Sequence, residues 1–150
     1  MEIATFLDLA RELELKISEL YRLASQSAIG GPLSSRLADI STEETNHANV
    51  LRVGKNYLIA APDLFVGVSL NGGDIQDGLK QAETLSIELK EGLALREGLK
   101  RLLGLEKRFE RIHLATSLEL SDPSLKKLFS SLSTGDQNHI HLLTEMISGD

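Results

Sequence analysis

Four acidic residues stand where a bundle of helices should have apolar core positions. Apolar residues recur every three or four positions along most of the chain, which is the spacing of the face that a helix buries against its neighbours. The pattern predicts helices over residues 3–28, 34–59, 94–120 and 123–147. Each of these stripes is interrupted by one acid, namely Glu14, Glu44, Glu106 and Asp136. An unpaired buried carboxylate costs several kcal/mol, and no Lys or Arg interrupts the stripes, so the acids must meet positive charge from another source.

The two halves of the chain repeat one pattern at an offset of 92 residues. Corresponding pairs include Leu7 and Leu99, Leu13 and Leu105, Glu14 and Glu106, Ser41 and Ser133, Glu44 and Asp136, Asn46 and Asn138, and His47 and His139. We therefore expect two similar helical hairpins, at about residues 3–59 and 94–147. They should pack together, because one hairpin cannot bury its own apolar face. Residues 1–150 then form a single domain.

Residues 60–93 connect the two predicted hairpins. Asn71-Gly72-Gly73-Asp74 is typical of a loop, whereas the apolar spacing from Ile75 to about Leu93 predicts a short fifth helix. Adjacent antiparallel helices need only a few connecting residues, so a link of this length suits one that travels the length of the bundle. Aromatic residues make up 4% of the chain and no long segment alternates apolar and polar residues, so strands are not expected. The predicted fold is an all-α four-helix bundle with a long crossover between its second and third helices.

The composition excludes several classes of function. The chain has no cysteine, which removes disulfides, zinc fingers, iron–sulfur clusters, rubredoxin-type iron and thiol nucleophiles. Its 16 basic and 22 acidic side chains give a net charge of −6, opposite in sign to that of a typical nucleic-acid-binding protein. The longest apolar stretch is interrupted by Pro62 and Asp63 and is too short to span a membrane, and the N-terminus lacks the basic region of a secretory signal. We therefore expect a cytoplasmic protein with neither a nucleic-acid nor a membrane partner.

Two of the inward acids are followed three residues later by a histidine, which gives the pairs Glu44–His47 and Asp136–His139. Residues three apart lie on one face of a helix, so each pair can hold a common ion. Two divalent cations would balance four carboxylates, and acids combined with acid-x-x-His pairs form the di-metal pattern of inward-facing helices. Oxygen and imidazole ligands together favour iron, followed by manganese and zinc. The alternative is a buried polar network without metal, which would have to satisfy all four acids at once.

The polar positions form four motifs: Glu14-x6-Tyr21, Glu44-x-x-His47, Glu106-x6-His113 and Asp136-x-x-His139. Together these motifs resemble those of the ferritin-like superfamily, and within it the rubrerythrin-like group. The resemblance covers both hairpins. It implies a di-iron centre that reacts with oxygen or hydrogen peroxide. The electrons would come from an external donor protein, because a chain without cysteine cannot hold a rubredoxin centre.

The metal ligands that the resemblance implies are Glu14, Glu44, His47, Glu106, Asp136 and His139. It also makes Tyr21 and His113 the candidate catalytic residues. Tyr21 has a simpler interpretation as a core tyrosine hydrogen-bonded to a ligand carboxylate, and His113 can either bind metal or hydrogen-bond to a ligand. We expect a homodimer or a higher homo-oligomer. Two other functions stand beside this one: the oxidation, transfer or storage of ferrous iron, and a non-catalytic bundle that keeps its metal for stability.

Three positions depart from the rubrerythrin-like pattern. Asp136 is one methylene shorter than the usual glutamate, His113 replaces a second core tyrosine, and Phe109 stands where peroxidase-type members carry a further glutamate. The departure at Phe109 argues against peroxidase chemistry more than against the metal site.

The remaining charged residues are expected at the surface. Glu19, Glu43 and His141 fall outside the apolar stripes. A basic cluster on the third predicted helix is interpreted as a solvated face, with the docking of an acidic electron donor as the alternative. Its members are Lys100, Arg101, Lys107, Arg108 and Arg111.

Overall fold

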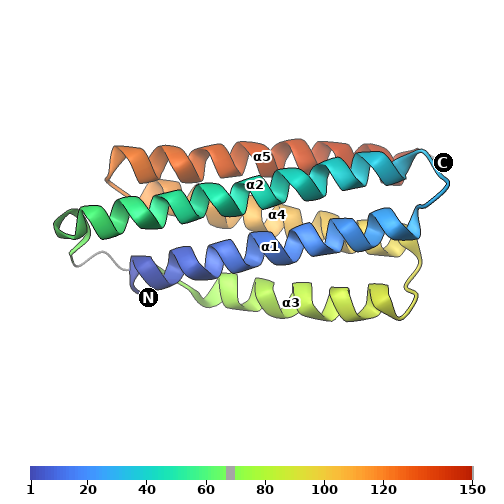
Figure 1. Ribbon diagram of the computed structural model, residues 1–150, viewed down its shortest axis with the longest axis horizontal. Helices are drawn as coiled ribbons and strands as arrows, with labels where there is room; N and C mark the ends of the chain where they lie inside the picture. Colours follow the sequence, from blue (N-terminus) through green and yellow to red (C-terminus); the bar gives the residue numbers. More distant parts are fainter. Residues whose placement is uncertain (67–69, 150) are drawn as a thin grey trace.

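The computed structural model describes residues 1–66 and 70–149 and is helical over most of that length (Figure 1). Its elements are α1 (Ile3–Ser27), α2 (Leu33–Ala60), the short 3₁₀ helix η1 (Pro62–Phe65), α3 (Gly73–Lys90), α4 (Leu95–Glu119) and α5 (Pro123–Ser148). The predicted all-α class is confirmed, and both ends of each of the four main helices lie within one residue of their predicted positions. Residues 67–69, which belong to the predicted connection, and residue 150 lie outside the described part.

The helices pack as two hairpins, with α1 against α2 and α4 against α5 (Figure 1). Helix α3 lies along the outside of these hairpins and contacts α1 and α4. In Figure 1, α2 and α4 run in the same direction, and α3 runs the opposite way. Every helix contributes fully buried side chains to one core, among them Phe6, Leu37, Ile75, Leu102 and Phe129. None of the described helices is apolar over a length that could cross a membrane.

The connection between α2 and α3 contains more helix than the sequence analysis predicts. The predicted loop over Asn71–Asp74 is wrong in its second half, because α3 begins at Gly73. The side-chain oxygen Oδ1 of Asn71 accepts a hydrogen bond from the backbone N–H of Gly73 at 3.0 Å, and this local turn leads the chain into the helix. The 3₁₀ helix η1 was not predicted; it begins at Pro62, whose ring restricts φ to a helical value.

The end of α3 also differs from its predicted position. The helix stops at Lys90, three residues before Leu93, and its 18 residues are close to the length predicted from Ile75 to Leu93. Gly92 has a φ of 98°, which favours glycine, and its N–H donates to the carbonyl of Leu89 at 3.2 Å. The N–H of Leu93 donates to the carbonyl of Glu88 at 3.0 Å, which completes a Schellman motif. Gly92 was therefore the stop signal that helical spacing alone overlooked.

The start of α5 is fixed by a capping aspartate. The carboxylate of Asp122 accepts a hydrogen bond from the backbone N–H of Leu125 at 3.0 Å, and Pro123 occupies the first helical position. The hydroxyl of Tyr57 on α2 donates to the same carboxylate at 3.1 Å. The cap therefore ties α2 to the beginning of α5, the helix that carries two of the predicted ligands.

Gly78 allows α3 to approach α4 closely. A Cβ at this position would lie 2.7 Å from Cε1 of Phe109, a fully buried ring of α4. Gly78→Ala should therefore lower the free energy of unfolding in urea by about 1–3 kcal/mol, because the ring or the helix must shift. Gly104→Ala, at an open position of α4, is the matched control and should raise it by about 0.5–1 kcal/mol. Equal effects of the two substitutions would show that α3 does not pack as described.

Candidate metal centre

The four predicted acids lie inside the bundle, one each from α1, α2, α4 and α5. Glu14, Glu44, Glu106 and Asp136 are each at most 1% exposed. They meet because the apolar stripes of the four helices face one another and each acid occupies a stripe position. With three histidines they form three groups of candidate ligands, and within each group the ligand atoms lie within 4.8 Å of one another.

The first group consists of Glu14, Glu44 and His47. The imidazole Nδ1 of His47 lies 3.4 Å from Oε2 of Glu44 and 3.8 Å from Oε2 of Glu14. Glu44 and His47 are three residues apart on α2, as the Glu-x-x-His motif predicts, and Glu14 comes from the neighbouring helix α1. Two carboxylates and one imidazole therefore converge at this position.

The second group consists of Glu44, Glu106 and His139. The imidazole Nδ1 of His139 lies 2.6 Å from Oε1 of Glu44 and 3.4 Å from Oε1 of Glu106. The rings of His47 and His139 stack with their centroids 5.7 Å apart. Glu44 thus belongs to both groups, with one oxygen beside each histidine, and is placed to bridge two ions.

The third group consists of Glu14, His113 and Asp136. The Nδ1 atom of His113 lies 2.5 Å from Oδ2 of Asp136, and its Nε2 atom lies 3.4 Å from Oε1 of Glu14. Asp136 and His139 were expected to hold a common ion, yet among the described residues these two do not share a group. The structure brings four of the other predicted ligands together around Glu44 and turns Asp136 toward His113.

Many of the converging atoms have no hydrogen-bond partner. The unsatisfied buried atoms are both oxygens of Glu14, both oxygens of Glu44, Nδ1 of His47, Oε2 of Glu106 and Nδ1 of His139. The 2.6 Å approach of His139 to Glu44 therefore lacks hydrogen-bond geometry. Buried polar atoms normally have a hydrogen-bond partner. A polar network without metal would leave these atoms without one. A mixed set of oxygen and nitrogen donors fits a divalent transition metal.

Burial and neighbouring charges strongly shift the pKa values of the acids and histidines. Burial, followed by the charges of Glu14 and Glu106, raises the pKa of Glu44 well above its usual value. Burial also acts to raise the pKa of Glu14, but Glu44, His47 and nearby His113 more than offset it and hold that pKa at about 2. The adjacent carboxyl groups Glu14 and Glu44 therefore share one proton in the absence of metal.

The pKa values of Asp136, His113 and His139 are shifted as well. Burial raises the pKa of Asp136 to about 7 despite the opposing effect of His113. Burial acts to lower the pKa of His113, but the charge of Asp136 and the hydrogen bond to it raise that pKa to about 9. The pKa of His139 is also about 9, because Glu106 and Glu43 outweigh the effect of burial. Without metal, this cluster retains protons that exposed groups would lose.

Tyr21 is fully buried beside the second group. Its hydroxyl donates a hydrogen bond to Oε1 of Glu106 at 2.7 Å. Burial and the charges of Glu106 and Glu44 raise the pKa of Tyr21 well above 10, so the hydroxyl keeps its proton. This contact is the hydrogen bond expected of a core tyrosine that orients a ligand carboxylate.

Glu43 is a site residue that the sequence analysis missed. Its side chain is 58% exposed, in keeping with the predicted surface position, but Oε2 lies 2.6 Å from Nε2 of His139. An N–H at Nε2 can donate to this carboxylate, which leaves Nδ1 of His139 to face Glu44 and Glu106. A sequence signal existed, because Glu43 is adjacent to Glu44 and is turned about 100° from it around the helix, toward the edge of the site.

Among the described residues, His47 in the first group has no counterpart of the Glu43 carboxylate that contacts His139. At the repeat offset of 92, the position corresponding to Glu43 is Gly135. A Cβ at Gly135 would lie 2.7 Å from Cε1 of His47, so glycine leaves the room that this imidazole occupies. The side chain of His47 is 19% exposed, whereas that of His139 is 1% exposed. The two histidines therefore differ in two ways: of the two, only His139 contacts the Glu43 carboxylate, and His47 is more exposed to solvent.

Two further surface expectations have different outcomes. His141 is exposed, as predicted, and its Nε2 lies 3.1 Å from Glu145. Glu19 is only partly at the surface, because its side chain is 26% exposed. Its carboxylate lies 3.0 Å from Lys16 on its own helix and 3.2 Å from Lys90 on α3. Helix α3 covers this part of α1, a contact that the stripe of α1 alone could not reveal.

Phe109, which stands where peroxidase-type members carry a further glutamate, packs against α3. The fully buried ring of Phe109 reaches Gly78 on α3. Its neighbour Glu110 accepts hydrogen bonds from Ser133 at 3.2 Å and from Gln137 at 3.1 Å, both on α5. Neither residue belongs to the three groups of candidate ligands.

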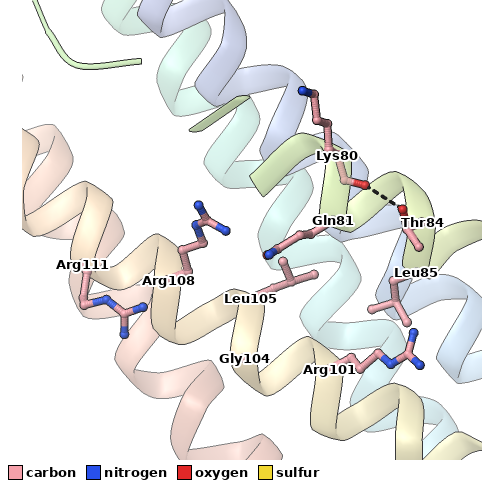
Figure 2. Close-up of a pocket in the computed structure, with 9 residues that line it drawn as sticks. All are labelled: Lys80, Gln81, Thr84, Leu85, Arg101, Gly104, Leu105, Arg108 and Arg111. Atoms are coloured by element: carbon pink, nitrogen blue, oxygen red, sulfur yellow. Dashed lines mark hydrogen bonds between the residues drawn. The ribbon is translucent and has the colours of Figure 1, made fainter. Parts of the chain in front are cut away.

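A pocket of about 580 Å³ lies between α3 and α4, and none of the buried acids lines it (Figure 2). Figure 2 shows three members of the basic cluster along its α4 side: Arg101, Arg108 and Arg111. Acids face two of them, with Glu88 and Glu97 beside Arg101, and Asp74 and Asp77 beside Arg108. This neutralisation favours the interpretation of the cluster as a solvated face over the docking of an acidic donor.

No family model, curated protein or solved structure matches the chain. The resemblance to ferritin-like proteins therefore rests on the sequence motifs alone. The structure establishes an all-helical bundle with buried Glu, Asp and His side chains in groups that could bind metal ions.

Proposed function

We propose that the protein is a ferritin-like, rubrerythrin-like di-iron protein with one domain over residues 1–150. In this proposal α1, α2, α4 and α5 form the four-helix bundle, and α3 is part of the crossover between α2 and α4. The opposite direction of α3 in Figure 1 supports this topology, since it returns the chain to the end at which α4 begins. The observation that carries the metal centre is the set of buried, unsatisfied carboxylate and imidazole atoms.

The first ion would be held by Glu14, Glu44 and His47, and the second by Glu44, Glu106 and His139. Two adjacent ferrous ions supply the two electrons that reduce oxygen or peroxide. Glu44 would be shared by both ions, because its Oε2 lies near His47 and its Oε1 lies near His139. The buried ligands, each at most 1% exposed apart from His47, keep water away from most of the site.

The residues around the ligands orient them and hold protons. The Tyr21 hydroxyl keeps its proton and donates a hydrogen bond to Oε1 of Glu106. The exposed carboxylate of Glu43 accepts a hydrogen bond from Nε2–H of His139, which would leave Nδ1 free to bind the metal. The proposed partners are oxygen or hydrogen peroxide, an external electron-donor protein and a second copy of the chain.

Ferrous iron handling is the second candidate function, and one observation favours it. His47 is the most exposed of the proposed ligands and has no carboxylate at the position that corresponds to Glu43. A ligand that reaches the surface allows one ion to exchange with solvent more readily than the other.

Anaerobic loading with ferrous iron tests both functions. We expect about two ions per chain after unbound iron has been removed, because each of the two groups that share Glu44 would hold one ion. One equivalent of hydrogen peroxide should then oxidise both ions in a single turnover, followed as ferric absorption. Continued uptake of many irons per chain would support storage instead, and less than one ion per chain would exclude the di-iron centre.

A further inference from the structure

The fourth acid of the bundle meets a histidine instead of completing the second group. Asp136 on α5 has the shortest side chain of the four acids, and its Oδ2 lies 2.5 Å from Nδ1 of His113 on α4. Both side chains are at most 2% exposed. Neither is among the buried groups that lack a partner, so their contact is a complete hydrogen bond within the site.

The internal repeat shows what this pair replaces. At the offset of 92, His113 corresponds to Tyr21 and Glu14 corresponds to Glu106. In one half, the Tyr21 hydroxyl donates to Glu106 at 2.7 Å. In the other half, Nε2 of His113 lies 3.4 Å from Oε1 of Glu14, and that oxygen has no hydrogen-bond partner. The tyrosine is a hydrogen-bond donor, whereas the imidazole presents a nitrogen to an unsatisfied carboxylate oxygen.

The contact with Asp136 decides which nitrogen of His113 is available. The carboxylate accepts the N–H at Nδ1, so the neutral ring carries its lone pair at Nε2, which faces Glu14. Metal bonds to imidazole nitrogen and carboxylate oxygen are about 2.0–2.2 Å long, so two ligands of one ion lie roughly 3–3.5 Å apart. The observed 3.4 Å between Nε2 of His113 and Oε1 of Glu14 matches that separation.

We propose that His113 is a metal ligand through Nε2, that it shares an ion with Glu14, and that Asp136 is a positioning residue that holds this imidazole. The proposal rests on the metal centre of the proposed function and changes its ligand set. The metal ligands then include three histidines, His47, His113 and His139. Asp136 does not bind metal itself but orients His113. Because Asp136 is one methylene shorter than glutamate, it leaves room for the ring of His113 between itself and Glu14.

Cobalt(II) serves as the probe, because it replaces ferrous iron and shifts the proton resonances of its imidazole ligands. In the loaded full-length chain, His113 should give an exchangeable, paramagnetically shifted N–H resonance from Nδ1. This resonance should exchange slowly with solvent, since Nδ1 is buried against Asp136. It should be absent from His113→Phe and present in the control His141→Phe, which replaces an exposed histidine on α5. A His113 that only hydrogen-bonds to Asp136 would give no such resonance.

Cobalt affinity, measured by competition with a chelator, is the second readout. His113→Phe should weaken one of the bound ions by about a hundredfold or more, and Asp136→Asn should weaken the same ion by about 10–100-fold. Thermal unfolding of each metal-free variant shows whether it folds, and the ring of Phe129, 6.0 Å from His113, provides apolar surroundings for the new phenylalanine. Unchanged affinities in both folded variants, without loss of a resonance, would overturn the proposal. A wild-type chain that binds no cobalt would instead overturn the metal centre itself.

Discussion

Replacing Glu44 with glutamine should remove both metal ions from the loaded protein, whereas Glu106→Gln should remove one. Glu44 is the carboxylate that the first two groups share, with Oε2 near His47 and Oε1 near His139. A neutral amide cannot bridge two cations through two anionic oxygens, so each dissociation constant should rise by about a hundredfold or more. The measurement is metal per chain after anaerobic loading and desalting.

The metal-free Glu44→Gln protein should nevertheless stay folded. Burial and the charges of Glu14 and Glu106 raise the pKa of Glu44 well above its usual value, which favours the neutral, protonated carboxyl group in the metal-free protein. Glutamine therefore replaces a neutral group of nearly the same shape, and the metal-free unfolding temperature should change little. Glu12→Gln, at an exposed position two residues before Glu14, is the matched control and should keep both ions. A folded Glu44→Gln protein with two tightly bound ions would show that Glu44 is not the bridge.

Loss of metal should also appear as a loss of thermal stabilisation. A ligand that binds only the folded chain, at a concentration one hundred times its dissociation constant, adds about 2.7 kcal/mol to the free energy of unfolding. For a chain of this length, that is roughly 5–10 °C in unfolding temperature. The wild type should gain this much with ferrous iron, and Glu44→Gln should gain almost nothing.

Local sequence patterns were sufficient to predict the helices and the inward acids. The ends of α1, α2, α4 and α5 follow from a periodicity that each segment carries by itself. Glu14, Glu44, Glu106 and Asp136 stand out because a charged residue on an apolar stripe must be buried once the helix packs. These inferences need no knowledge of which helices are neighbours.

The pairings within the site depend on rotamers and on the register between helices, which the sequence does not encode locally. Asp136 and His139 share a helix face, yet Asp136 turns to His113 on α4. Glu43 lies outside the apolar stripe of α2 but still contacts His139, because α2 and α5 pack side by side. The coverage of Glu19 by α3 likewise depends on where the connecting helix packs. Comparing Glu43 with Gly135 through the repeat would have revealed the asymmetry, but not its consequence for His47.

The metal-free protein should be most stable in mildly acidic solution and should lose stability as the pH rises from 5 to 9. Glu44, Asp136, His113 and His139 all have folded-state pKa values above their ordinary ones, with about 7 for Asp136 and about 9 for each of the two histidines. Their stabilisation is fully present below the unfolded-state pKa and is lost as the pH passes the folded-state pKa. Glu14 has the opposite shift, to a pKa of about 2, and its contribution declines only below pH 4.5.

The unfolding temperature of the metal-free chain at pH 5, 7 and 9 measures this loss. Each extra proton held by the folded state changes the free energy of unfolding by about 1.4 kcal/mol per pH unit. Two such protons retained over part of this range correspond to a fall of about 10 °C or more. Asp136→Asn removes one titrating group and the charge that holds the proton on His113, so this variant should show a shallower dependence. A metal-free wild type that is most stable at pH 9 would contradict the shifts.

Metal should reverse the dependence, because the ion binds the deprotonated carboxylates and imidazoles and competes with the same protons. At pH 5 Asp136, His113 and His139 hold their protons, so ferrous iron should raise the unfolding temperature only slightly. At pH 9 the Asp136 proton is gone and each of the histidines His113 and His139 is about half deprotonated, so the same concentration of metal should give a greater stabilisation than at pH 5. The difference between the loaded and metal-free curves therefore grows with pH, and a scaffold that folds around neutral polar groups without metal would show no such growth.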